Sequence, residues 1–170
     1  MKSILITIQT FIIAFLIAII ISNQDILLAI ETTRSIEALN KNSLYADINI
    51  YRSLNGLPKL EINNLLEESS DVKVKDMIER KYWAHYLVSK QEDLWDLFIE
   101  SGYDYSHAGE NLAKGFGTSE GVLKGWKESP IHNRLLLSPK YTDIGITISC
   151  QKNWLQVEEE CLVVLHLAGY

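Results

Sequence analysis

The fold is decided by three segments that follow one another along the chain: GENLA (Gly109–Ala113), WKESPIH (Trp126–His132) and YTDIG (Tyr141–Gly145). The first segment supplies an acid, Glu110, and the second supplies an imidazole, His132. A further imidazole, His85, lies upstream of both. We therefore predict a polar site built around Glu110 and His132, with His85 converging on the same cleft.

The size and charge of the chain restrict the possible functions. A length of 170 residues is typical of one domain with a core large enough to fold without a metal or a disulfide. The net charge is −6, and basic residues are never clustered beyond Glu79-Arg80-Lys81. Such a surface offers no electrostatic footprint for a phosphate backbone, which argues against nucleic-acid binding.

The amino end has a different composition from the rest. Residues 4–21 are almost unbroken Ile, Leu, Phe and Ala, preceded by Lys2 and followed by polar residues. This pattern predicts an export or anchor segment whose positive end stays in the cytoplasm. Everything after it is then exported, to an extracellular, periplasmic or membrane-anchored location.

Cleavage of this segment and its retention both remain open. Its length suits a spanning helix, whereas a cut after Ala29 would place Leu27 where signal peptidase prefers a small residue. No cysteine follows to take a lipid. We expect residues 1–29 to be a signal peptide or membrane anchor, residues 30–42 a polar spacer, and residues 43–170 the folded domain.

Hydrophobic spacing predicts helices in the first part of this domain. One runs from residue 43 to a turn at Gly56, and another from residue 62 to Tyr82, just before His85. Capping and stop residues predict three more helices. Ser89 and Glu92 cap the first, which stops at Gly102. Thr118 caps the second, and Pro130 opens the third, which runs to Leu136.

Strands are expected near the carboxyl end. Residues 144–150 alternate between apolar and small or polar side chains, and residues 162–167 form an apolar run interrupted by His166. No helix separates them, so they should pair antiparallel, and residues 106–112 form another extended piece. The pattern predicts an α+β domain with helices on the faces of a small sheet. Cys150 and Cys161 either close a disulfide across the hairpin or remain two buried thiols.

From residue 44 onward the sequence resembles the CAP domain family, also called SCP-like, which includes cysteine-rich secretory proteins, venom antigens and plant pathogenesis-related proteins. The resemblance is carried by INIYRSLNGLPKL (residues 48–60), DM (76–77), YWAH (82–85), GYDYSHAGENLAKGF (102–116), WKESPIH (126–132) and YTDIGI (141–146). It implies a three-layer α-β-α sandwich with a small antiparallel sheet between helices. It also implies a cleft lined by two histidines and two glutamates, which in some members bind zinc or another divalent metal.

Three of these four cleft residues carry over, as His85, Glu110 and His132. The second glutamate does not, because Ser129 stands in its place and Glu128 comes one position earlier. One residue rotates a side chain by about 100° around a helix, so Glu128 is the weaker candidate and is expected to turn toward solvent. The Ser-Pro pair before His132 and the two cysteines resemble the bacterial branch of the family.

This residue set has a metal-binding interpretation and a structural one. Two imidazoles and a carboxylate can hold zinc with an open position, lowering the pKa of a bound water to about 7. The alternative role of Glu110 is structural, as an acceptor for backbone N–H groups. His107 is interpreted as a solvated residue, His166 as an ordinary strand residue, and Ser129 lacks the surroundings of a serine nucleophile.

We favour a non-enzymatic binding module and assign no catalytic residue. Its partner would be a small apolar or lipid ligand, or a surface protein, held in the cleft and an aromatic groove beside it. The membrane is involved only through the amino-terminal segment. The alternative is a metal-assisted hydrolase, in which His85 and His132 hold the ion and Glu110 is a ligand or a general base.

Overall fold

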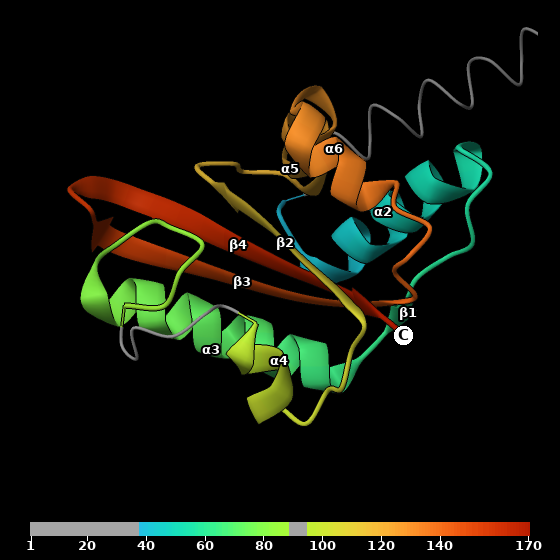
Figure 1. Ribbon diagram of the computed structural model, residues 1–170. Coiled ribbons are helices and arrows are strands. Elements are labelled where there is room, and N and C mark those ends of the chain that lie inside the picture. Colours follow the sequence, from blue (N-terminus) through green and yellow to red (C-terminus); the bar gives the residue numbers. More distant parts are fainter. Residues whose placement is uncertain (1–37, 89–94) are drawn as a thin grey trace, which may run out of the picture. The chain divides into compact units, whose positions relative to one another are not determined.

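The computed structural model describes residues 38–88 and 95–170 (Figure 1). The predicted export segment, most of the spacer and the Ser89/Glu92 capping pattern lie outside these residues. Along the chain the elements are α2 (Lys41–Leu54), β1 (Glu61–Ile62), α3 (Asn64–Arg80), α4 (Asp96–Glu100), β2 (His107–Lys114), α5 (Ser119–Glu128), α6 (Pro130–Leu136), β3 (Asp143–Trp154) and β4 (Val157–Gly169). No helix in the described ranges is long and apolar enough to cross a membrane.

The sheet has four strands in the order β1-β3-β4-β2. β3 and β4 form the predicted antiparallel hairpin, and β2 pairs antiparallel with the other side of β4. The two-residue strand β1 joins β3 in parallel, so the sheet is mixed and not purely antiparallel as predicted. Its central strand β4 is buried on both faces, which explains the continuous apolar run in the sequence.

Helices cover both faces of the sheet, as Figure 1 shows, with α3 and α4 on one side and α2, α5 and α6 on the other. On the second side, Ile48 and Trp126 pack against Ile146 and Leu165. On the first side, Met77 of α3 packs in a cluster with neighbouring strand residues such as Val164. The predicted α+β sandwich of three layers is therefore confirmed.

The helix starts follow the signals in the sequence. The side chain of Thr118 accepts a hydrogen bond from the Gly121 amide at 3.0 Å, as the predicted cap of α5. Pro130 opens α6, where its missing N–H costs nothing. Asn40 and Asn63 cap α2 and α3 in the same way.

Gly145 sets the distance between α3 and the sheet. A Cβ at this position would overlap the carbonyl group of Leu66 and the amide of Glu67, which are backbone atoms of α3. Next to this contact, the hydroxyl groups of Ser70 and Thr147 are hydrogen-bonded at 2.7 Å. The glycine thus lets the inner face of α3 lie directly against β3 and β4.

Buried Arg52 ties the end of α2 to the segment that leads into β3. Its guanidinium donates hydrogen bonds to the carbonyl groups of Pro58, Leu136, Ser138 and Tyr141, at 2.8 to 3.4 Å. Burial lowers the pKa of this group. The charge is nevertheless well accommodated, because the guanidinium is surrounded by carbonyl oxygens that accept its hydrogen bonds.

The hairpin of β3 and β4 is closed by a disulfide. Cys150 and Cys161 lie opposite each other in the register and are joined in the structure, so the disulfide alternative is the one the fold adopts. Trp154 near the turn is buried and donates its indole N–H to the carbonyl of Met77. The hairpin is thus fastened both internally and to α3.

Candidate functional site

Glu110 is the centre of the site. Its side chain is fully buried on β2, where Oε1 accepts a hydrogen bond from Nδ1 of His85 at 2.6 Å and Oε2 accepts one from Nε2 of His166 at 3.1 Å. Burial by itself would raise the pKa of Glu110, but the bonds from His166 and His85, together with the charge of Lys73, hold it below the ordinary value. Glu110 is therefore an ionised carboxylate with both oxygens occupied.

The contact of Gly109 with Tyr141 explains why the residue before Glu110 is a glycine. A Cβ at Gly109 would lie 2.6 Å from the hydroxyl of Tyr141, which donates a hydrogen bond to the carbonyl of Ala108. A larger residue would push Tyr141 away from β2. The glycine thus fixes the start of the strand on which Glu110 is carried.

His166 completes the carboxylate contacts, although its place in an apolar run predicted only an ordinary strand residue. It lies directly opposite Glu110 in the pairing of β2 with β4, and it is fully buried. Its Nδ1 is 2.8 Å from the hydroxyl of Ser69, and its ring stacks on Phe98 with centroids 4.6 Å apart. The available signal was a histidine inside an otherwise apolar run, where a polar group needs a partner.

His85 lies in the segment after α3, and its side chain is 59% exposed. Buried groups on α3 hold this segment in place. Lys73 donates to the carbonyl of Tyr86 at 2.7 Å and to the hydroxyl of Tyr82 at 3.1 Å, and Asp76 accepts from the Val88 amide. His85 consequently keeps one ring edge against Glu110 and the other toward solvent.

Lys73 is the cation that balances this buried region. It is fully buried, which lowers its pKa, while the carboxylates of Glu110 and Asp76 act in the opposite direction. A positive charge beside the two carboxylates compensates their charge where water is excluded. The site therefore rests on a compensated cluster and not on isolated charges.

His132 lies beside this cluster, on the third residue of α6. Its carbonyl accepts a hydrogen bond from the side chain of buried Asn111 at 3.1 Å, which ties α6 to β2 next to Glu110. Burial and then the charge of His85 lower the pKa of His132. The charge of His85 thus acts on His132, whereas the second histidine in contact with Glu110 is His166.

Glu128 is not part of the cleft. It ends α5 with its side chain 67% exposed, as the one-residue shift predicts, and lies 3.9 Å from Lys124. It lines a surface hollow that also includes Tyr51. The second acid of the family pattern has no substitute in the contacts described above.

The residues present do not fit a three-ligand metal site. Nδ1 of His85 and both oxygens of Glu110 are already hydrogen-bonded, which leaves the outer nitrogen of His85 and the ring of His132 as ligands. Within residues 38–88 and 95–170, no group of three or more His, Cys, Asp or Glu side chains is arranged to hold an ion. Catalytic zinc normally takes three protein ligands.

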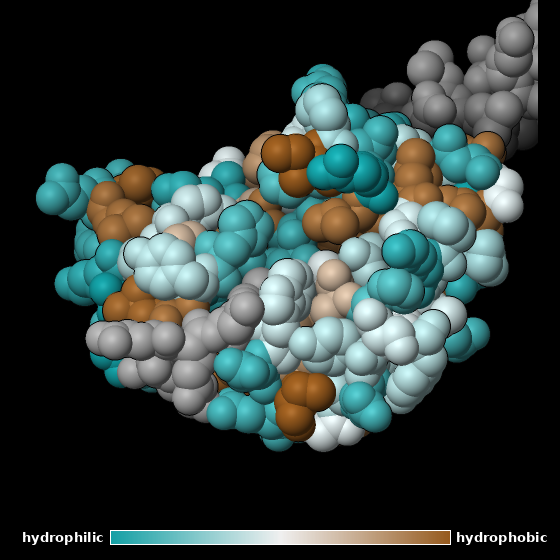
Figure 2. Space-filling view, in the orientation of Figure 1, coloured by the Kyte–Doolittle hydropathy of each residue, from teal (hydrophilic) through white to brown (hydrophobic). Residues whose placement is uncertain are grey.

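The sequence neighbours of the two histidines include exposed apolar side chains. Tyr86 follows His85 and is 61% exposed, and Ile131 precedes His132 and is 63% exposed. Figure 2 shows hydrophobic side chains at the surface over the region of α5 and α6, among polar ones. Exposed apolar side chains thus stand next to both histidines in the sequence.

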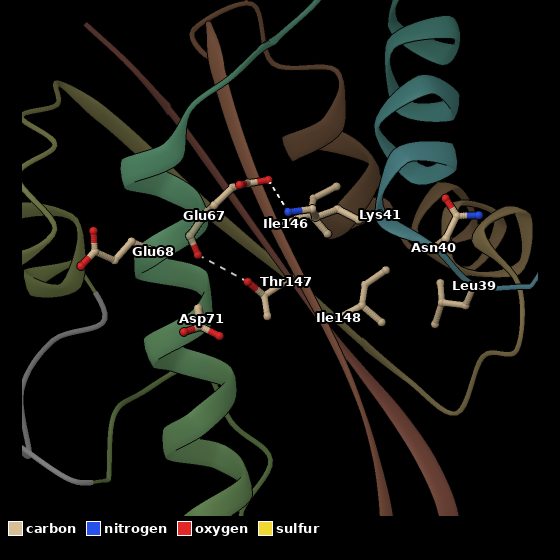
Figure 3. Close-up of a pocket in the computed structure, with 9 residues that line it drawn as sticks. All are labelled: Leu39, Asn40, Lys41, Glu67, Glu68, Asp71, Ile146, Thr147 and Ile148. Carbon is tan, nitrogen blue, oxygen red and sulfur yellow. Dashed lines mark hydrogen bonds and ion pairs between the residues drawn. The ribbon is translucent and has the colours of Figure 1, made fainter.

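A second hollow lies elsewhere, between the start of α2, α3 and β3 (Figure 3). It has a volume of about 660 Å³, and the ion pair of Lys41 with Glu67, at 2.7 Å, spans it. Ile146 and Ile148 form its apolar side. None of the predicted site residues lines this pocket.

Sequence comparison finds relatives over the same part of the chain. The family described as "CAP: Cysteine-rich secretory protein family" matches residues 45–165. The uncharacterized protein YkwD of Bacillus subtilis is 36% identical over 98 residues, which cover 58% of this chain and 38% of that protein. The uncharacterized membrane protein YlbC of the same organism is 29% identical over 118 residues, covering 69% and 34%. The chain thus spans less than half the length of either relative.

Two solved structures share the fold. An extracellular protein containing a SCP domain from Bacillus anthracis gives a TM-score of 0.64 at 22% identity, covering 76% of this chain and 40% of that one. An outer surface protein from Borrelia burgdorferi gives 0.66 at 20% identity, covering 79% and 98%. Together with the family match over residues 45–165, they lead to one conclusion: this chain belongs to the cysteine-rich secretory protein (CAP) family.

Proposed function

We propose that residues 38–170 form an exported, non-enzymatic binding module that takes a small ligand with an apolar body and a polar group. The observation that carries this proposal is the state of Glu110, whose two oxygens each accept an imidazole N–H. A carboxylate held in this way orients histidines and is poorly placed to activate a substrate water. Its role in the proposal is to support the cleft.

The groups left for a ligand are the outer edge of His85, the ring of His132 and the apolar surfaces of Tyr86 and Ile131. An apolar body would bury the last two, which are largely exposed in the free domain. A polar head would meet the imidazoles. Export of the domain is the expectation that the apolar residues 4–21 support.

The experiment is a titration with 1-octanol followed by amide NMR. We expect shift changes confined to the region of His85, Tyr86, Ile131 and His132, and we expect Ile131→Asn to weaken binding by about fivefold or more through lost apolar contact. Val157→Asn is the matched control. Val157 is also an exposed apolar residue, but it opens β4 about 30 Å along the strand from His166.

Equal weakening by both variants, or shifts spread over the hairpin, would contradict the proposal. Stoichiometric zinc in protein purified without chelator, lost in the His132→Ala variant, would also contradict it and would favour metal-assisted hydrolysis instead.

A further inference from the structure

Four side chains form a continuous hydrogen-bonded chain through the α3 side of the sheet. Ser69 contacts Nδ1 of His166 at 2.8 Å, Nε2 of His166 contacts Glu110 at 3.1 Å, and Glu110 contacts Nδ1 of His85 at 2.6 Å. Ser69, His166 and Glu110 are buried, whereas His85 is 59% exposed. The chain thus leads from the interior to the surface at His85.

The positions of the protons along this chain follow from Glu110. An ionised carboxylate only accepts hydrogen bonds, so each imidazole nitrogen that faces it carries the hydrogen. A neutral imidazole has one N–H, and the other nitrogen is an acceptor. In the neutral rings, therefore, His85 is protonated at Nδ1 and His166 at Nε2.

Ser69 determines the hydrogen bonding at the buried end of this four-residue chain. With Nε2 of His166 protonated, Nδ1 has a lone pair, and the Ser69 hydroxyl donates to it at 2.8 Å in preference to the carbonyl of Leu66 at 3.0 Å. This bond and the stacking on Phe98 hold the His166 ring in one orientation. His166 then holds Oε2 of Glu110, which leaves Oε1 directed at His85.

We infer that Ser69 and His166 are positioning residues, which act through the buried carboxylate on the tautomer of His85. Nδ1 of His85 is engaged inside, so its Nε2 presents a lone pair to the cleft. The ligand class that follows from this tautomer rests on the proposed function, and it names the ligand chemistry of the same site. The outer nitrogen of His85 takes a polar group that donates a hydrogen bond, such as a hydroxyl or an amide, and disfavours a carboxylate or phosphate, which would face its lone pair.

The tautomer is read by long-range proton–nitrogen NMR of the full chain at about pH 8, where an unperturbed imidazole is neutral. We expect His85 with Nδ1 protonated and Nε2 bare. His166→Leu should convert this single form into a mixture of tautomers, because Oε2 loses its donor and the carboxylate is free to turn. His166→Gln should restore the single form, since its amide N–H can reach Oε2 and it avoids an unpaired buried carboxylate.

His107→Leu is the matched control, because His107 opens β2 on the same strand as Glu110 and lies outside the four-residue chain. Its replacement should leave the His85 signals unchanged. A wild-type His85 protonated at Nε2, or a His166→Leu variant that keeps the single Nδ1–H form, would overturn the assignment. Neither result depends on any ligand.

The ligand class is tested separately with two probes of equal chain length. 1-Octanol should bind at least about tenfold more tightly than octanoate at about pH 8, because only the alcohol donates a hydrogen bond to Nε2. Octanoate binding as tightly as octanol would overturn the ligand class. If neither probe binds while His85 shows the expected tautomer, the proposed function fails and the positioning roles stand.

Discussion

At the scale of the residue, Glu110 is a buried acid whose partners are all supplied by the protein. Two imidazoles and the charge of Lys73 lower its pKa, against the effect of burial. The folded pKa lies below the ordinary value of 4.5, so this group stabilises the fold above about pH 4.5, and the contribution is lost as pH falls below it. Acid should therefore lower the free energy of unfolding of the domain, in part through protonation of Glu110.

Glu110→Gln tests this linkage. At neutral pH the variant should lose about 2–4 kcal/mol of unfolding free energy, because one imidazole N–H then faces an amide N–H in a buried position. The difference from wild type should shrink as pH falls below about 4.5. Urea unfolding at several pH values measures it, with exposed Glu120→Gln as the control, and a difference independent of pH would contradict the argument.

The family motifs point to part of this hydrogen-bonded cluster and miss one member of it. His85, Glu110 and His132 carry the motifs, and the structure brings the first two into contact. His166 was missed because its contact with Glu110 depends on the register of β2 against β4, which local sequence does not encode. The spacing correctly predicted that Glu128 faces solvent, since the rotation per residue of a helix is fixed.

At the scale of the element, α3 lies in direct backbone contact with β3 at Gly145. Gly145→Ala should destabilise the domain by about 3 kcal/mol or more, since the added Cβ meets backbone atoms that cannot rotate away. Gly117→Ala is the matched control, because nothing lies within 4 Å of a Cβ at that position. Thermal unfolding compares the two, and similar melting temperatures would refute the close contact.

The elements with clear local signals in the sequence were the ones that could be predicted. A Thr118 cap and a Pro130 start define α5 and α6 in the sequence, and the structure keeps both. β1 was not predicted, because its two residues are held in parallel by Asp143 and Ile144, far away in the chain. Strands of this length carry no period that sequence alone reveals.

At the scale of the whole molecule, the disulfide limits the freedom of the unfolded chain. Cys150 and Cys161 are 11 residues apart. Replacing both by Ser should lower the unfolding free energy by about 2–3 kcal/mol, the value expected for a short closed loop. The histidine NMR signals of the folded variant should match wild type, and altered His85 signals would show that the hairpin supports the cleft directly.

The strand order has a consequence for how the chain acquires its structure. β4 is last in the sequence, yet it lies between β3 and β2, and in the described part of the chain β2 pairs only with β4. During synthesis β2 must therefore wait for β4, and its pairing closes a large loop, a topology that folds slowly. The histidine network draws on α3, β2 and β4, so it forms only after β4 has paired with β2.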